Sequence, residues 1–446
     1  MNNSLSKKFN LPSMLAFTLP NVIMMLFLSM YTIVDGMFVS RFVGTTALSS
    51  INMVYPAISV EMALAIMIST GGSAIIAIRL GEGRLQTAKE NFSFLVLVEL
   101  LLGILVAVLG ILFAEPLLHL LGTTEAQFET GKTYLVILMA FSPFFFLQTA
   151  FQTFFVTAGK PVLGLTVTVL AGLTNMVLDY VFIVPLQMGI AGAALATGIG
   201  YSIPALTGIL YFFLAKKGSL HFTVPKFDGL VLLRSCTNGS SEMVSNLANA
   251  VTTFLFNLIF LKYYGEDGVA SITIVLYFQF VFSAVYFGYS SGIAPVISFK
   301  YGHGEHSQLK TLVKNSLILV SVCSAATFGL SFLVMKAALP FFAGPDSAVY
   351  RITMDGFPYY APGFLFMGIS IFASAMFTAF SDGLISAVIS FARTFIFLAG
   401  CILLLPPLLG KNGLWMAVPA AEILGFVISV FFLVKKKKTY HYGGKE

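Results

Sequence analysis

Four polar residues stand inside long apolar stretches of this chain: Asp35, Asn175, Asp179 and Thr197. A carboxylate at the centre of a membrane-length helix costs about 2.5–3.5 kcal/mol on insertion scales, so such groups usually face a cavity or a partner. Hard cations prefer the oxygens of carboxylate, amide and hydroxyl groups as ligands, and two neighbouring carboxylates readily share an exchangeable proton. The residue types therefore predict a site for H⁺ or Na⁺.

The stretches that carry these residues are long enough to be membrane helices. The chain is 58% hydrophobic and 10% charged, whereas soluble domains carry about 25% charged residues. A helix needs about 20 residues to cross the bilayer core, and the short alternating segments of a membrane β-barrel do not occur in the sequence. We predict an all-α integral membrane protein with twelve transmembrane helices, near residues 11–38, 48–78, 92–113, 134–156, 163–184, 190–214, 235–261, 270–299, 312–337, 358–380, 384–405 and 414–434.

The four polar residues fall at a common depth in this predicted bundle. Asp35 lies near the end of the first helix, and Asp179 lies near the end of the fifth. Asn175 is one turn before Asp179 and projects from the same helix face, while Thr197 is about two turns into the sixth helix. At 1.5 Å per residue the four depths agree within roughly 10 Å. We expect one cation-coupling site, the alternative being four separate helix–helix contacts.

Positive charge is distributed unevenly between the two sides of the predicted bundle. Eighteen of the 25 Lys and Arg residues fall on one side, including Lys7, Lys8, Lys216, Lys217 and the tail 435–438. The positive-inside rule then places both termini in the cytoplasm, in a multi-pass protein of the cell (inner or plasma) membrane. Because the lipid bilayer explains the basic excess, we expect no nucleic-acid partner.

The sequence repeats itself at a shift of 221 residues. Gly71 falls on Gly292 and Pro185 on Pro406, and one register holds from residue 44 to residue 217. An even number of helices in each repeat gives two six-helix lobes related by a pseudo-two-fold axis along the membrane normal, with a cavity that opens to one side at a time. The predicted domains are an N-terminal lobe at 10–215, a cytoplasmic linker at 216–230 and a C-terminal lobe at 231–438.

The polar constellation is absent from the second repeat. The 221-residue shift places apolar residues or glycine at the matching positions, which are Phe256, Ile396, Gly400 and Val418. A requirement of the scaffold would be expected in both copies. Its loss from one copy favours a task performed in the first lobe alone.

Further residues in the apolar stretches are candidates for other roles. Pro20 lies about four turns before Asp35 and removes a backbone hydrogen bond, so it predicts a bend or hinge. The remaining buried charges could line the cavity and contact substrate, or form structural ion pairs or snorkel to the helix ends; they are Glu61, Glu99, Glu242, Arg393 and Glu422.

Enzyme chemistry is not indicated. The five histidines fall in or beside loops, the three cysteines lack metal-site spacing, and no nucleophile–base motif is present. We therefore expect a monomeric non-enzyme without cofactors, apart from a coupling ion, with small organic cations as substrates.

Several motifs together resemble the multidrug and toxic compound extrusion (MATE) family, in its DinF-like and MepA-like bacterial or archaeal branch. They are Val34-Asp35-Gly36, Gly71 with Gly81-x-Gly83, Asn175-x-x-x-Asp179, Gly192-Ala193-Ala194-Leu195-Ala196-Thr197 and Gly410-Lys411-Asn412-Gly413-Leu414-Trp415. The resemblance covers essentially the whole chain.

This resemblance implies a multidrug efflux antiporter driven by H⁺ or Na⁺. It assigns Asp35, Asn175, Asp179 and Thr197 to the cation site, adds the backbone at Ala193, and makes Pro20 the bending point of the first helix. The chain departs from NorM-like members because residues 358–380 contain no acid and Glu242 lies early in its helix, which puts a second-lobe ion site in doubt. A flippase for lipid-linked oligosaccharides or other lipid-linked precursors is the alternative, but such proteins tend to line their cavity with several bases, and Arg393 is the clear intramembrane base here.

Overall fold

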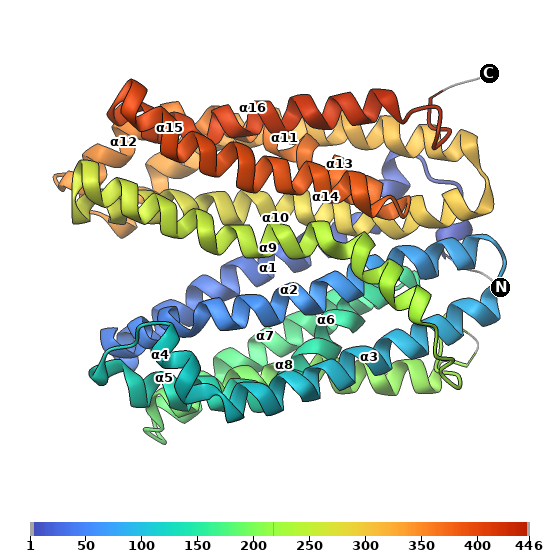
Figure 1. The fold of residues 1–446 in the computed structure, drawn as a ribbon, viewed down its shortest axis with the longest axis horizontal. Helices are drawn as coiled ribbons and strands as arrows, with labels where there is room; N and C mark the ends of the chain where they lie inside the picture. Colours follow the sequence, from blue (N-terminus) through green and yellow to red (C-terminus); the bar gives the residue numbers. More distant parts are fainter. Residues whose placement is uncertain (1–3, 217, 444–446) are drawn as a thin grey trace.

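The chain folds into long helices that lie roughly side by side (Figure 1). This computed structural model describes residues 4–216 and 218–443, without the side chains of residues 45, 46, 48 and 126; Lys217 of the predicted linker lies outside the described residues. The elements are η1 Ser4–Ser6, α1 Leu11–Phe42, α2 Thr45–Gly81, α3 Leu85–Leu112, α4 Ala114–Leu120, α5 Glu125–Ala140, α6 Ser142–Thr157, α7 Pro161–Ile183, α8 Gly189–Leu214, α9 Gly229–Tyr264, α10 Glu266–His303, α11 His306–Phe342, α12 Ala348–Tyr360, η2 Ala361–Gly363, α13 Phe364–Ala379, α14 Gly383–Phe391, η3 Ala392–Ala399, α15 Gly400–Leu409 and α16 Lys411–Lys435.

Within residues 4–216 and 218–443, eleven helical spans are long and apolar enough to cross a membrane, and one bent pair of helices that counts as a single span makes twelve. The bent pair is α5 and α6, which meet at Phe141 with an angle of 55°. Pro143 at the start of α6 has no amide hydrogen to continue the helix, which is consistent with a break at this point. The predicted all-α, twelve-helix, two-lobe fold is confirmed.

The helix bounds differ from the prediction where polar residues belong to helices. The tenth span begins at Ala348 rather than near residue 358, because an amphipathic turn carrying Arg351 and Asp355 continues into the apolar segment. The third span likewise begins at Leu85, ahead of its apolar run. Hydropathy finds the membrane-buried part of a helix, whereas helices here extend beyond it.

Two groups of helices are visible in Figure 1, α2–α8 below and α9–α16 above. They come close at the end of the molecule that carries both chain termini, here called the terminal end. Glycines make this approach possible: a Cβ on Gly71 of α2 would lie 2.0 Å from the carbonyl oxygen of Ser235 in α9, and one on Gly81 would lie 2.1 Å from that of Phe299 in α10. The backbones of the two groups therefore touch at the terminal end.

The chain's own ends cover the terminal end. Ser4 Oγ donates to the carbonyl oxygen of Gly159 between α6 and α7 at 2.9 Å. Lys300 Nζ of α10 donates to the carbonyl oxygen of Ser6 at 3.1 Å, and the amide of Phe9 donates to Gln308 of α11 at 2.9 Å. Residues 4–9, here called the strap, thus bind elements from both helix groups.

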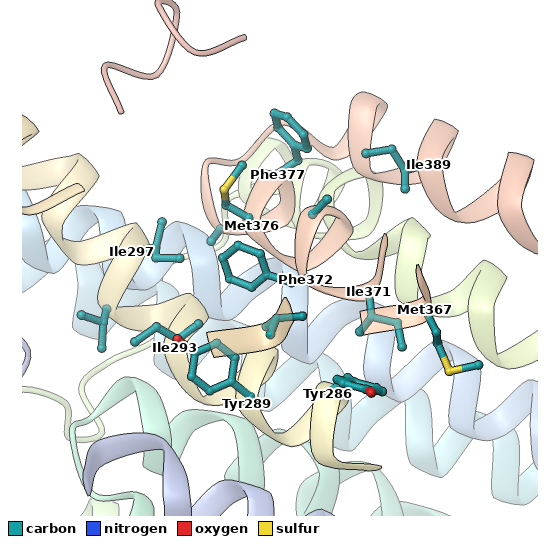
Figure 2. Close-up of a cluster of buried hydrophobic side chains, with 14 of the residues drawn as sticks. Tyr286, Tyr289, Ile293, Ile297, Met367, Ile371, Phe372, Met376, Phe377 and Ile389 are labelled. Atoms are coloured by element: carbon teal, nitrogen blue, oxygen red, sulfur yellow. The ribbon is translucent and has the colours of Figure 1, made fainter. Parts of the chain in front are cut away.

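The second group of helices has an apolar interior. Figure 2 shows α10 packed on α13 and α14 through Tyr286, Tyr289, Ile293, Ile297, Met367, Ile371, Phe372, Met376, Phe377 and Ile389. Phe256, the repeat counterpart of Asp35, is itself fully buried. In the second lobe, a hydrophobic packing residue thus occupies the position that Asp35 has in the first lobe.

Candidate functional site

Asp35 and Asp179 form the centre of the predicted site. Asp35 is half-buried on α1 and Asp179 is buried on α7. The two carboxyl groups lie close enough to interact with each other. Two neighbouring carboxyl groups can share one proton, because a protonated carboxyl donates to an ionised one, which only accepts. The fold therefore brings together two acids from helices that lie far apart in the sequence.

Asn175 and Thr197 lie beside this pair. Both are buried, and Asn175 Nδ2 donates to Thr197 Oγ1 at 3.3 Å. Asn175 precedes Asp179 by one turn of α7, while Thr197 lies on the neighbouring helix α8. Ala193, also buried, is one turn before Thr197. The packing of α7 against α8 thus positions the neutral part of the site.

Three of these residues carry buried oxygen atoms without a hydrogen-bond partner. Oδ1 of Asp35, Oδ1 of Asn175 and Oδ1 of Asp179 are each buried without a hydrogen-bond partner. Buried polar atoms are normally paired, so each exception needs an explanation. A proton or a small cation fits this donor set, since two carboxylates, an amide oxygen and a hydroxyl suit a hard ion.

Three tyrosines around the acid pair were not predicted from the sequence. The phenol groups of Tyr31 and Tyr134 interact electrostatically with both Asp35 and Asp179, and that of Tyr201 interacts with Asp35. Their spacing offered a signal: Tyr31 is one turn before Asp35 on α1, and Tyr201 is one turn after Thr197 on α8. Tyrosine hydroxyls give the site hydrogen-bonding groups that remain neutral at ordinary pH.

Glu61 of α2 is connected to the site through Tyr201. Its side chain is 5% exposed and lies near the hydroxyl of Ser142, while its Oε1 has no hydrogen-bond partner. The Tyr201 phenol interacts electrostatically with Glu61 as well as with Asp35. Of the additional acids proposed from the sequence, Glu61 is the one tied to the Asp35–Asp179 pair by a shared neighbour.

Arg393 and Glu422 form an ion pair in the second group of helices. Nε of Arg393 lies 3.1 and 2.9 Å from the two carboxylate oxygens of Glu422, and Nη2 lies 2.7 Å from Oε1. Arg393 belongs to the π-helical segment η3 and Glu422 to α16. This geometry supports the structural ion pair that the sequence left open.

The remaining candidates lie apart from the acid pair. Glu99 of α3 is fully buried near the contact between α2 and α9, and Glu242 is partly buried on α9. Pro20 lies inside α1, which continues as one helix from Leu11 to Phe42. Its neighbour Asn21 donates to the carbonyl oxygen of Gly288 at 2.8 Å and to Ser291 at 2.7 Å, both in α10.

A mostly apolar cavity of about 900 Å³ lies away from the terminal end, near the far ends of α9 and α10. Its wall includes Phe254, Leu258 and Phe342, with the polar groups of Asn257 and Thr273 and the carboxylate of Glu266. Oδ1 of Asn257 is buried without a partner. An apolar wall with a few polar groups and an acid is suited to a lipophilic cation.

Comparisons with known proteins agree on one family. The MatE family model matches residues 20–181 and 243–403, one stretch in each sequence repeat. Multidrug export protein MepA of Staphylococcus saprophyticus is 25% identical over 365 residues, 80% of each chain, and that of Staphylococcus haemolyticus is 24% identical over 428 residues, 94% of this chain and 92% of the relative. A solved outward-facing conformation of a multidrug resistance MATE family transporter superposes with a TM-score of 0.91 at 20% identity, covering 98% of both chains.

Proposed function

Because the chain belongs to the MatE family, we propose that it is a cation-coupled antiporter that exports lipophilic organic cations across the cell membrane by alternating access. H⁺ or Na⁺ is the coupling ion, and it binds in the first lobe at Asp35, Asn175, Asp179 and Thr197. The two relatives described above, both named multidrug export proteins, support export of small molecules.

The observation that carries this proposal is the set of buried oxygens without hydrogen-bond partners on Asp35, Asn175 and Asp179, two of which belong to neighbouring carboxyl groups. Two ionised carboxylates carry a charge of −2, and each H⁺ or Na⁺ that binds reduces this charge by one unit. A charge change inside a low-dielectric lobe is worth more than one in water. The site can therefore favour one arrangement of the helices when loaded and another when empty.

Cation and substrate are then linked by conformation. If each ligand prefers a different arrangement of the lobes, each lowers the apparent affinity for the other, and the effect is reciprocal. The cavity between α9 and α10 suits the apolar body of an organic cation, with Glu266 near its charge. The far ends of α9 and α10 would thus provide part of the export path.

A flippase for lipid-linked precursors is the weaker alternative. Holding a diphosphate needs free basic groups in the cavity, and among the described residues Arg393 is already held by Glu422 through three short contacts. Orientation remains part of the proposal: we place both termini, and therefore the terminal end, in the cytoplasm on the basis of the basic residues.

Substrate efflux from proteoliposomes under separately imposed pH and Na⁺ gradients tests the function. Purified protein should expel a fluorescent lipophilic cation when one of the two gradients is applied, and should leave an anionic dye of similar size untouched. The informative control is the same membrane with both gradients collapsed by ionophores. Equal efflux with and without every gradient, or export of the anion alone, would refute coupled cation export.

A further inference from the structure

Glu99 is the most deeply buried acid of the first lobe, and the proposed coupling site does not use it. Its side chain is 0% exposed on α3. The hydroxyl of Ser69 on α2, also 0% exposed, lies 2.7 Å from Glu99 Oε1, and Glu99 Oε2 is buried without a partner. Among the described residues no basic group pairs with Glu99, so a structural ion pair does not explain this buried acid.

Counting hydrogens indicates that Glu99 carries a proton. Ser69 Oγ lies 2.8 Å from the carbonyl oxygen of Ala65 as well as 2.7 Å from Glu99 Oε1. A serine hydroxyl has one hydrogen, and a backbone carbonyl only accepts. Both short contacts are satisfied when the serine donates to Ala65 and a protonated Glu99 donates to the serine. If Glu99 were ionised, Ser69 Oγ would face either the carboxylate or the carbonyl oxygen of Ala65 without a hydrogen between them. The charged Oε2 would also be buried without a partner, which costs free energy.

The surroundings of Glu99 offer no compensating positive charge. Among the described residues, α2 presents Ser69 and α9 presents the thiol of Cys236, the ionisable group that interacts electrostatically with Glu99. The helix α6, which packs along α3, contains no ionisable residue from Ser142 to Thr157. The charged residues of α5 lie in its first half, away from the terminal end. On α3 itself, Lys89 is ten residues from Glu99, which is about 15 Å along the helix.

The enclosure of Glu99 depends on the contact between the two helix groups. Gly71, two residues after Ser69, packs backbone to backbone against Ser235 of α9, the residue before Cys236. A Cβ on Gly239 would likewise lie 1.9 Å from the carbonyl oxygen of Met67 in α2. Movement of α9 away from α2 would therefore open a route for water to the neighbourhood of Glu99.

We propose that Glu99 is a second proton-binding residue of the transport cycle, distinct from the Asp35–Asp179 pair, and that its neutral form is required for the lobes to close at the terminal end. When α9 leaves α2, water reaches the carboxyl group, its O–H bond breaks, the proton passes to water, and the carboxylate is hydrated. Reclosure needs a proton back from the same side. This inference rests on the proposed function only in assuming that the lobes alternate.

The sign of the effect follows from this linkage. Acidic conditions on the terminal side favour the neutral carboxyl and hence the closed terminal end, whereas raising the pH favours the parted state. Glu99→Gln keeps a neutral side chain whose amide can donate to Ser69, so it should close without a proton. Glu99→Asp keeps the titration and serves as the matched control.

Distance measurements between spin labels can test this directly. Labels at Thr87→Cys on α3 and Lys310→Cys on α11, both exposed near the terminal end, would be introduced into full-length protein in nanodiscs after replacing the three native cysteines by alanine. We expect the fraction of parted molecules to rise with pH in the parent and in Glu99→Asp, and to stay low and constant in Glu99→Gln. An unchanged pH profile in Glu99→Gln would overturn the proposal.

Two additional measurements keep this test separate from the proposed coupling site. Asp35→Asn should retain the pH-dependent parting assigned to Glu99, even though coupled export falls by about tenfold or more. Infrared difference spectra should lose one protonated-carboxyl band in Glu99→Gln at neutral pH, and retention of every such band would contradict a neutral Glu99. Failure of export in liposomes with both results intact would count against the function and not against Glu99.

Discussion

Asn21 and Asp35 attach one helix to two different lobes. Asn21 donates from α1 to Gly288 and Ser291 of α10, whereas Asp35, about 21 Å farther along α1, interacts with Asp179 of α7. The first attachment lies between the helix groups and the second lies inside the first lobe. A change in the charge of the acid pair therefore acts on α1, the helix that also contacts the other lobe.

Removing either acid should uncouple transport from the ion gradient. Asp35→Asn and Asp179→Asn keep the size of the side chain but leave a single acid, which cannot share a proton or neutralise a cation as the pair does. Since coupling free energies are typically about 1–3 kcal/mol, we expect gradient-driven export in liposomes to fall by about tenfold or more. Asp355→Asn, an exposed acid on α12, is the matched control, and wild-type rates and ion dependence in both site variants would contradict the first-lobe site.

The tyrosines around the pair should tune cation affinity without being essential. Tyr31→Phe removes the hydroxyl of a phenol that interacts with both acids but preserves the ring and its packing on Phe27. Because this polar group interacts with both acids, its loss should lower the apparent affinity for the coupling ion severalfold, while the maximal export rate changes less. Tyr180→Phe, an exposed position on α7, should leave the affinity where it was.

The sequence was informative wherever a single helix carried the signal. Asp35, Asn175, Asp179 and Thr197 could be grouped because apolar stretches set their depth and because i,i+4 spacing set their face. Partners 22 or 29 residues apart on packed helices, such as Asn175 with Thr197 or Arg393 with Glu422, depend on how helices rotate about their axes. Hydropathy does not determine this rotation, so the hydrogen bonds and the break at Phe141 emerged only with the three-dimensional structure.

The Arg393–Glu422 pair should matter for stability more than for coupling. Glu422→Gln would leave the guanidinium of Arg393, whose side chain is 14% exposed, without its counter-charge, and breaking a fully buried pair in this way costs about 3–5 kcal/mol. Thermal unfolding in detergent should show a clear loss for Glu422→Gln and partial recovery in Arg393→Met combined with Glu422→Leu. Equal losses in the single and double variants, or normal stability with altered ion dependence, would argue for a role in transport.

Pro20 should affect the rate of export rather than folding. It lies beside the anchor Asn21, and a proline inside a helix removes one backbone hydrogen bond and allows a bend. A bend there would let the Asp35 half of α1 move while Asn21 stays bound to α10. Pro20→Ala should therefore reduce gradient-driven export severalfold, with normal membrane yield and melting temperature. An unchanged export rate would show that transport does not require a bend at Pro20.

The strap at residues 4–9 should hold the terminal end closed. It joins Gly159 of the first helix group to Lys300 and Gln308 of the second, and Lys300 is itself 0% exposed and paired with Glu305 at 3.0 Å. Lys300→Met preserves much of the buried aliphatic stem but removes both the bond to Ser6 and the ion pair. Glu305 is partly exposed to water, so it tolerates the loss of Lys300 as its partner. The main effect should be a weaker contact between the two helix groups at the terminal end.

The same pair of spin labels at positions 87 and 310 measures that closure. We expect Lys300→Met, and deletion of residues 2–9, to raise the parted fraction at every pH while leaving its pH dependence in place, because Glu99 still titrates. Lys314→Met, a position on α11 outside these contacts, provides the control for loss of one basic residue. A parted fraction identical to that of the parent in both strap variants would show that the glycine-lined contacts of α2 with α9 and α10 close the terminal end without the strap.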